Sequence, residues 1–414
     1  MKSYIKLISI EKINNKAVYH YDISENIKKY FNTKENFYVE YSDSIVDVPE
    51  GVMVIPFICN ILPIIWLTNS ILIIDEIDED FYNSINNFKQ GYINMYPNLK
   101  FNGELKINRI VNNLQKQTNN GTLFSGGVDA FATLIAHIKE KPTLITVWGA
   151  DIHIDDTEGW QNVYQHILDT AQLFNLPFSI IKCNLKDFLN PKTTCDLVRK
   201  SGDDYWHGFQ HGIGLLGLSS PLAFKNGIGK LYIASSYTAK DKVTCASHPT
   251  IDSQLRFCQT EIYHDQYEYT RQEKIKHICQ FVKEENTNIK LRVCWDSRGG
   301  SNCMKCEKCI RTILGLIAEG ANPEKFGFPN INNQYRNISK IIRKKLILNK
   351  LIISFWQEIQ KELIKNSRNI DIPTDLKWLL TTPIEEINKT NKKRFILICY
   401  SIRHFIGNLI KSLS

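Results

Sequence analysis

Apolar and polar positions follow different patterns in the first and middle parts of the chain. Before residue 115 helical periodicity is weak, and runs rich in β-branched and aromatic residues, such as residues 37–41 and 71–74, predict strands. We therefore expect a separate N-terminal α+β region over residues 1–115. A longer apolar run, residues 52–74, contains prolines and asparagines and has acidic flanks, so it predicts buried strands and turns and not a membrane-spanning helix.

From residue 121 onward, short apolar runs alternate with helical patterns. One helix begins near Val128 and places its apolar side chains on one face, and others begin near Thr157 and Asp203. Because strands that alternate with helices form parallel sheets, we expect an α/β fold with a doubly wound parallel sheet. Its strands are expected at residues 121–124, 143–148, 178–183 and 230–235.

The rest of the chain is expected to be mainly helical. The pattern predicts a helix that Gly320 ends and, at the C-terminus, a long helix followed by a basic amphipathic one. The predicted elements are a helix over 272–283, a strand over 289–294, and helices over 306–318, 338–364 and 392–413.

Length and charge divide the chain into three parts. A chain of 414 residues is long enough for two or three domains, and we expect them at residues 1–115, 118–325 and 330–414. Residues 331–414 carry 16 Lys and Arg against 6 Asp and Glu, a net charge of +10, so the remainder carries −2 of the total of +8. The N-terminus shows no secretory signal, which predicts a cytoplasmic protein with reduced cysteines.

A glycine-rich loop, Phe124-Ser125-Gly126-Gly127-Val128-Asp129, joins the first predicted strand of the sheet to its helix. At such a junction the helix directs free backbone N–H groups at one point, and glycines let an anion approach closely. Ser125 can donate a hydroxyl, and Asp129 can cap the helix or hold a Mg²⁺-bound phosphate. On the two adjacent glycines alone, a tight turn without a ligand would be the favoured interpretation, and neither a Walker loop nor a dinucleotide fingerprint is present.

Four cysteines lie within 16 residues, at Cys294, Cys303, Cys306 and Cys309. Their spacing is typical of a tetrahedral Zn²⁺ site. Four thiolates fill the coordination sphere and leave no position for water, so the zinc would be structural. An iron–sulfur cluster is the alternative.

The two motifs together point to a family. Ser-Gly-Gly-x-Asp after a first strand resembles the pyrophosphatase loop of the N-type ATP pyrophosphatases, the PP-loop superfamily. The cysteine cluster followed by Arg311 resembles 7-cyano-7-deazaguanine synthase of queuosine biosynthesis, and the resemblance covers about residues 118–320. The family loop usually ends in Ser, whereas this chain has Ala130, which removes one hydroxyl.

The resemblance implies an adenine nucleotide α-hydrolase-like fold with a zinc knuckle, and three cofactors or ligands: ATP, Mg²⁺ and Zn²⁺. It implies that residues 124–129 bind the nucleotide and that the four cysteines hold zinc. It also implies catalytic roles for Ser125, Asp129 and Lys274, the last in the sequence Arg271-Gln272-Glu273-Lys274-Ile275.

The substrate loop departs from the family pattern. Residues 244–252 contain a cysteine, a proline and an aspartate, but not in the family's order. His248 and Asp252 could hold substrate or move a proton, or could have no such role. His207 and His211 have the spacing of a metal pair on a helix, although packing or substrate contact by His207 is favoured over metal.

The predicted activity is adenylation of a small-molecule carboxylate, such as 7-carboxy-7-deazaguanine, followed by ligation to an amine. The extra length favours a protein acceptor, as in lengthened relatives found in bacterial antiviral defence clusters. Alternatives are a free 7-cyano-7-deazaguanine synthase that uses ammonia, a tRNA thiolation enzyme that uses Cys183, Cys195 or Cys245, and a non-enzymatic nucleotide sensor. Nucleic acid is a less favoured partner, although the basic C-terminal part would suit RNA.

Overall fold

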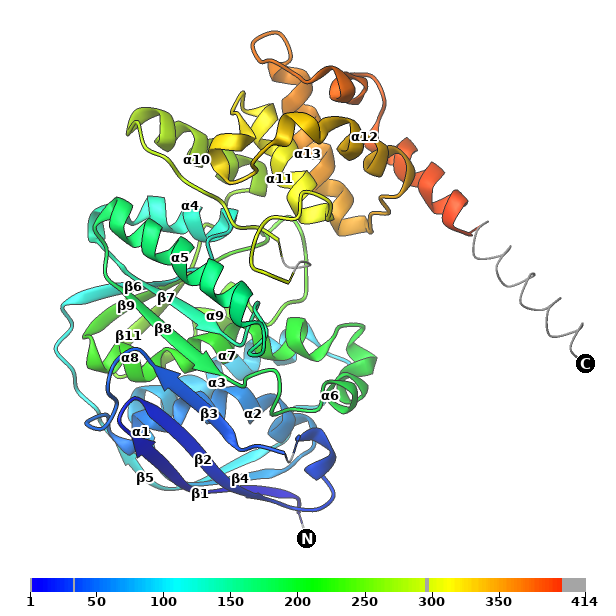
Figure 1. Cartoon of the computed structure of the whole chain (residues 1–414). Helices are drawn as coiled ribbons and strands as arrows, with labels where there is room; N and C mark the ends of the chain where they lie inside the picture. The colour runs from blue at the N-terminus through cyan, green and yellow to red at the C-terminus, as the bar shows by residue number, and fades with distance from the viewer. Residues whose placement is uncertain (1, 33, 295–297, 397–414) are drawn as a thin grey trace, which may run out of the picture. The chain divides into compact units, whose positions relative to one another are not determined.

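The computed structural model describes residues 2–32, 34–294 and 298–396 (Figure 1). The chain forms two compact units. The first, the sheet unit, comprises Met1–Glu268 and Arg298–Gly300, and the second, the helical unit, comprises Tyr269–Ser297 and Ser301–Ser414. The glycine-rich loop belongs to the sheet unit, and the four clustered cysteines belong to the helical unit.

The sheet unit is built on one 11-stranded sheet of order β10-β11-β9-β6-β7-β8-β3-β2-β1-β4-β5. Most neighbouring strands are parallel, which confirms the α/β class. The strands are β1 (Tyr4–Ile13), β2 (Lys16–Ile23), β3 (Phe37–Tyr41), β4 (Ile71–Asp78), β5 (Glu104–Val111), β6 (Asn119–Leu123), β7 (Thr143–Trp148), β8 (Phe178–Cys183), β9 (Ile228–Ala234), β10 (Arg256–Phe257) and β11 (Thr260–Asp265).

From β6 onward, helices begin near Val128 and Thr157, where the sequence predicts them. The glycine-rich loop leads into α4, and α5 lies along β7 and β8 (Figure 1). A π-helix, η4 (Trp206–Gln210), continues directly into α7 where one helix was expected. The helices of this unit are α1 (Glu50–Met53), α2 (Ile55–Leu67), α3 (Glu79–Met95), α4 (Val128–Ala136), α5 (Thr157–Phe174), α6 (Pro191–Val198), α7 (His211–Leu218), α8 (Ser220–Lys225) and α9 (Pro249–Asp252).

The N-terminal strands belong to the same sheet as the strands that carry the glycine-rich loop. Strand β3 pairs with β8 in an antiparallel register that places Val39 opposite Cys183 and Tyr41 opposite Ile181. Beside this seam, the buried Asn184 carboxamide accepts from the Tyr38 N–H at 3.0 Å and donates to the Asn36 carbonyl at 2.9 Å. The sheet therefore runs across the position near residue 115 where the sequence suggested a domain boundary.

The apolar run over residues 52–74 is helical where strands and turns were expected. It forms α1, α2 and the start of β4, and nearly every side chain of α2 is buried. A helix that is buried on all sides is apolar on all sides, so it shows no periodicity that separates it from a strand. Helix α7 packs closely on α2, since a Cβ on Gly217 would lie 2.5 Å from the Cys59 Cβ. Among the described residues, no helix combines the length and apolar character that crossing a membrane requires.

The helical unit contains α10 (Arg271–Glu284), α11 (Glu307–Ala318), α12 (Tyr335–Lys344) and α13 (Lys350–Asn366). Helices α10 and α11 match the predicted helices, and Gly320 has the left-handed φ of +71° that suits a helix end. Residues 384–396 are also helical, whereas the rest of the predicted helix over 392–413 lies outside the described residues.

Two predictions for this unit are wrong. Residues 289–294 form no strand, because their backbone groups bond instead to the Phe326 carbonyl and to the side chain of Asn302. The predicted helix over 338–364 is two helices. Asn349 caps the second helix, α13, by accepting from the Ile352 N–H at 2.8 Å. In the segment between the two helices, the Asn388 side chain accepts from the Leu348 N–H and donates to the Leu348 carbonyl.

The seam between β3 and β8 gives a test of the continuous sheet. We expect Asn184→Ala to lower the free energy of unfolding by about 1–3 kcal/mol, because it leaves the Tyr38 N–H and Asn36 carbonyl without their partner. Asn108→Ala removes an exposed bond to Asp75 and should change the stability by less than about 0.5 kcal/mol. Urea unfolding of both variants measures the difference, and equal midpoints would contradict a structural role for this seam.

Candidate functional site

The glycine-rich loop begins where β6 ends and finishes in the first turn of α4. Phe124 fixes its base: the Phe124 N–H donates to the Ile145 carbonyl at 2.8 Å, and the Thr146 hydroxyl donates to the Phe124 carbonyl at 2.6 Å. The Phe124 ring packs edge-on against Phe131 of α4, with ring centroids 5.0 Å apart. The strand and the helix therefore hold the loop from both ends.

The two glycines have different backbone roles. Gly126 has φ of +77°, in the left-handed region that favours glycine. Gly127 is the N-cap of α4 with an extended backbone, φ −80° and ψ 175°, and makes no side-chain cap. A capping side chain would occupy the first N–H groups of the helix, so a glycine here leaves room for an anion.

The loop lies where the connections of the sheet change direction. Strand β6 has β7 on one side and β9 on the other, both parallel to it. The chain runs from β6 through α4 to β7 and then to β8, and later returns to β9 on the opposite side of β6. In open parallel sheets, ligands bind beyond the carboxyl ends of the strands at such a point.

The side chains of the loop are placed as the sequence predicts. Ser125 is exposed, and Asp129 lies in the first turn of α4. Ala130 is buried, with 4% of its surface exposed, so a serine at this position would place its hydroxyl in the packed side of the helix. The missing hydroxyl therefore leaves the exposed edge of the loop unchanged.

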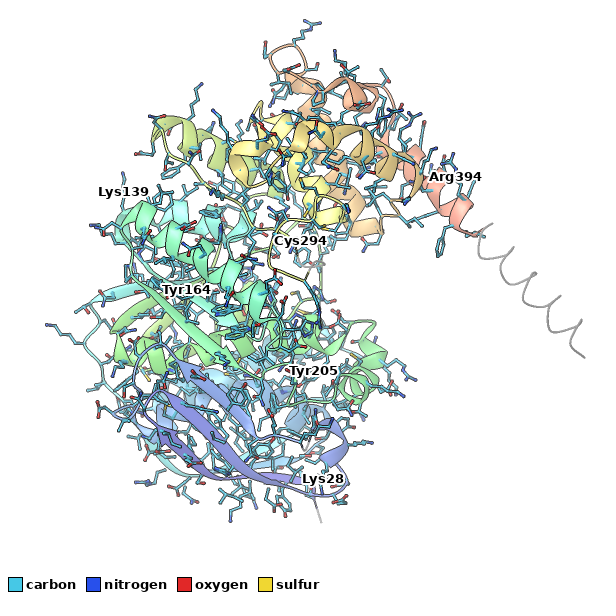
Figure 2. All side chains as sticks on the ribbon, in the orientation of Figure 1. Lys28, Lys139, Tyr164, Tyr205, Cys294 and Arg394 are labelled. Carbon is cyan, nitrogen blue, oxygen red and sulfur yellow. The ribbon has the colours of Figure 1, made fainter. Side chains whose placement is uncertain are left out.

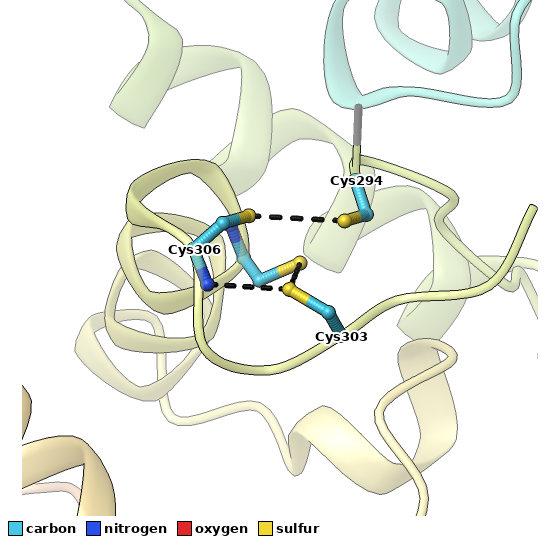
Figure 3. Close-up of side chains that lie close together, drawn as sticks. Cys294, Cys303 and Cys306 are labelled. Carbon is cyan, nitrogen blue, oxygen red and sulfur yellow. Dashed lines mark hydrogen bonds between the residues drawn. The ribbon is translucent and has the colours of Figure 1, made fainter. Parts of the chain in front are cut away.

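The four cysteines of the helical unit converge on one point. Their sulfur atoms all lie within 4.8 Å of one another, with 3.8 Å between Cys294 and Cys306 and 4.0 Å between Cys303 and Cys309 (Figure 3). Four sulfurs bound to one tetrahedral zinc at about 2.3 Å lie about 3.8 Å apart. Across the described part of the chain, no other group of three or more Cys, His, Asp or Glu side chains meets the same criterion.

Backbone N–H groups donate to two of the sulfur atoms in this cluster. The Cys306 N–H donates to the Cys303 sulfur at 3.2 Å, and the Cys309 N–H donates to the Cys306 sulfur at 3.5 Å, which makes Cys306 the N-cap of α11. Hydrogen bonds from Cys309, first from its thiol and then from its backbone, lower the pKa of Cys306. The same thiol bond raises the pKa of Cys309, so a divalent cation would displace the remaining protons.

Helix α11 connects the cysteine cluster to α13. Arg311 is buried and pairs with Glu307 at 2.9 Å, and its guanidinium lies 4.9 Å from the centre of the Phe355 ring. The Trp356 indole N–H also donates to Glu307, at 2.7 Å. Arg311 thus holds two helices together in the unit that the cysteines organise.

Lys274 lies in α10 of the helical unit and is buried, with 1% of its surface exposed. Gln272 of the same helix donates to the Gly315 carbonyl of α11 at 3.1 Å. A buried lysine costs desolvation, which distinguishes it from an ordinary exposed helix residue. Its predicted catalytic role stays a prediction.

His207 belongs to a polar cluster of the sheet unit. Its Nδ1 lies 2.9 Å from an oxygen of Asp203, and its Nε2 lies 3.3 Å from the Tyr237 hydroxyl. His207 belongs to π-helix η4, which Tyr205, labelled in Figure 2, directly precedes. Tyr237 follows the carboxyl end of β9, the neighbour of β6, so the cluster is tied to the same edge of the sheet as the glycine-rich loop.

His248 and Asp252 take different positions. His248 caps α9, with its Nδ1 accepting from the Thr250 N–H at 3.2 Å and its Nε2 lying 3.1 Å from the Tyr267 hydroxyl. Burial and then the charge of His264 lower its pKa. Asp252 is fully buried and accepts from Ser247 at 2.7 Å, and its carboxylate lies 2.8 Å from His264 Nδ1. Asp252 therefore fixes the loop internally.

The sequence interpretation did not single out Asp203 or Tyr96. Tyr96 follows α3 in the N-terminal region and donates to Asp203 at 3.0 Å. The repeat Asp203-x3-His207-x3-His211 was a local signal for Asp203. No local signal could have identified Tyr96, because its partner is 107 residues away.

The cysteine cluster predicts one bound zinc per chain. We expect Cys306→Ser to lose most of this zinc and to make residues 290–320 more sensitive to proteolysis, because metal binding is coupled to folding. Cys195→Ser, in α6 of the sheet unit, is the control and should keep both zinc and protease resistance. Elemental analysis and timed proteolysis measure the two effects. Iron with visible absorbance, or a folded protein without metal, would contradict this assignment.

Comparisons of the chain with models of protein families, with curated proteins and with solved structures find no match. The functional argument therefore depends on the residues themselves. Two arrangements carry it: a glycine-rich loop at a change in sheet connection, and four cysteine sulfurs at zinc spacing.

Proposed function

We propose that this protein cleaves ATP between the α and β phosphates and transfers the adenylyl group to a carboxylate. The observation that carries the proposal is the position of the glycine-rich loop beyond β6, between the parallel strands β7 and β9. The resemblance of Ser-Gly-Gly-x-Asp to the PP-loop superfamily supports cleavage between the α and β phosphates of ATP. The four-cysteine site supports it, because it follows the loop in the order found in 7-cyano-7-deazaguanine synthase.

The loop would hold the departing pyrophosphate. The first N–H groups of α4 point beyond its N-terminus, where the helix dipole favours negative charge. As the bond to the α phosphate breaks, negative charge grows on the pyrophosphate, and preorganised donors stabilise that charge without reorganising. Ser125 adds an exposed hydroxyl at the same loop.

Asp129 is the residue that fits Mg²⁺. It is a carboxylate in the first turn of α4, beside the position where phosphates would lie, and Mg²⁺ prefers oxygen ligands shared between carboxylate and phosphate. When bound, Mg²⁺ would neutralise phosphate charge. The zinc site, with four sulfur donors, has no open position and would support folding of the helical unit.

The proposed carboxylate is 7-carboxy-7-deazaguanine or a close analogue, and the proposed acceptor is an amine of a partner protein in an antiviral defence system. The carboxylate oxygen would attack the α phosphorus, and the resulting acyl-adenylate would then be attacked by the amine. The substrate assignment rests on the resemblance, and the acceptor rests on the length of chain beyond residues 118–320.

Gly127→Val tests the loop directly. The backbone of Gly127 is extended, so valine can adopt its φ and ψ, and the substitution adds a side chain beside the space proposed for phosphate. We expect AMP formation to fall by at least about 100-fold, as when donors to a transition-state anion are lost. AMP and pyrophosphate are measured by ion-exchange chromatography with 7-carboxy-7-deazaguanine as substrate.

The control is Ala136→Val, which places the same side chain at the exposed end of the same helix. It should retain wild-type AMP formation. Equal loss in both variants would mean that α4 is merely unstable to valine. An unchanged rate in Gly127→Val would contradict nucleotide binding at this loop.

A further inference from the structure

Cys245 lies in the loop between β9 and α9, beside two imidazoles. The imidazoles of His207 and His211 are the groups that lower the pKa of its thiol. The backbone on both sides of the thiol is fixed: the Cys245 N–H donates to the Met95 sulfur at 3.2 Å, and the Ala246 N–H donates to the His207 carbonyl at 2.8 Å. The backbone at Cys245 is thus held at a defined position beside His207.

Asp203 orients the imidazole of His207. One carboxylate oxygen lies 2.9 Å from His207 Nδ1, which directs Nε2 toward Cys245 and Tyr237. The other oxygen accepts from Tyr96 at 3.0 Å and from Thr244 at 3.2 Å. A thiol, an imidazole and an orienting carboxylate in this order form the arrangement that activates cysteine nucleophiles.

The charges in this cluster favour a thiolate. The hydrogen bond to Asp203, followed by that to Cys245, raises the pKa of His207 to about 11, so its ring is cationic at neutral pH. Burial opposes ionisation of Cys245, but hydrogen bonds from His207 and His211 outweigh it and lower its pKa to about 7. By contrast, burial raises the pKa of Cys183 and that of Cys279 to about 12.

Phenols also lie near the thiol, and so does the buried carboxyl group of Asp252, which accepts from Ser247 two residues after Cys245. Tyr92 and Tyr96 come from α3 and its C-terminal end, and burial raises the pKa of each. Tyr237 approaches from the loop after β9. Since the phenols of Tyr92 and Tyr96 stay neutral near pH 7, the charged groups that act on Cys245 are the two histidines, with Asp203 and Asp252 as the nearby carboxylates.

The cluster is accessible from solvent on one side. Cys245 itself is 4% exposed, but the side chain of His207 is 34% exposed. Tyr237 connects the cluster to the carboxyl end of β9, the strand next to β6. The thiol therefore belongs to the edge of the sheet at which the glycine-rich loop lies.

We propose that Cys245 is a nucleophile that accepts an activated acyl group as a thioester, with His207 as its cationic partner and Asp203 as the residue that positions His207. The source of the acyl group, an acyl-adenylate, rests on the proposed function. The nucleophilicity of the thiol does not depend on it, so the two can be tested separately.

The step balances without a further reactant. The Cys245 thiolate attacks the acyl carbon, a C–S bond forms, and the bond between that carbon and the phosphate oxygen breaks, so AMP leaves with the electron pair. An amine then attacks the thioester, a C–N bond forms and the C–S bond breaks. The electron pair returns to Cys245 as thiolate, and the proton of the amine passes to solvent, while His207 remains protonated.

The test uses the full chain and p-nitrophenyl acetate, an activated ester that needs no ATP. We expect an acetyl group on Cys245, located by peptide mass spectrometry and removed by neutral hydroxylamine. It should form at least about tenfold faster than on Cys279 at neutral pH, because the thiolate is the attacking species. Its rate should rise with pH with a midpoint near the Cys245 pKa of about 7.

Asp203→Asn tests the positioning role. Loss of the carboxylate lowers the pKa of His207 and so raises that of Cys245, and the midpoint should move to higher pH, with the rate at neutral pH at least about threefold lower. Cys195→Ser, outside the cluster, should keep the wild-type profile. If Cys245 in the wild-type protein is acetylated no faster than Cys279, the proposal is wrong whether or not the variant folds.

A second measurement separates this proposal from the proposed function. The wild-type protein is incubated with ATP, Mg²⁺ and 7-carboxy-7-deazaguanine without an amine, and its intact mass is measured. A hydroxylamine-sensitive adduct on Cys245 supports the thioester, and AMP formation without that adduct overturns it. If no AMP forms, adenylation fails, and the acetylation profile still decides whether Cys245 is the nucleophile.

Discussion

The parallel pairing of β6 with both β7 and β9 is the constraint on which the rest of this structure depends. Because the chain leaves β6 toward one side of the sheet and returns on the other, the loop after β6 has no connection crossing over it. Phe124 fixes the loop to β7, and Gly127 begins α4 without a capping side chain. The same edge receives the chain leaving β9, which brings Tyr237 and then Cys245.

The N-terminal region contacts the residues at this edge of the sheet, beyond the carboxyl ends of β6 and β9. Its strand β3 extends the sheet through β8, and its helix α3 packs against the polypeptide around η4 and α9. Tyr92 donates to the Phe209 carbonyl at 2.9 Å, and Tyr96 binds Asp203. A Cβ on Gly91 would lie 2.4 Å from the Thr250 carbonyl, so α3 approaches that loop as closely as a glycine permits. The region therefore forms part of the surroundings of Cys245.

Local sequence signals predicted those elements and sites that depend on residues close together in the chain. The strands over residues 143–148 and 178–183, the start of α4 at Val128 and the convergence of four cysteines all follow from periodicity or spacing. Helix α2 was missed because burial on every side removes periodicity, and the break between α12 and α13 depends on Asn388, which lies 40 residues from Leu348. The Asp203 to Tyr96 contact likewise joins distant segments, so no motif could reveal it.

The proposed chemistry requires the protein to form an acyl-adenylate reversibly at the glycine-rich loop. The most direct measurement is exchange of radiolabelled pyrophosphate into ATP, with 7-carboxy-7-deazaguanine present and no amine added. We expect label to enter ATP only when the carboxylate is present, and Gly127→Val to abolish the exchange. Absence of exchange, with ADP and orthophosphate as the products of ATP, would contradict the proposed chemistry.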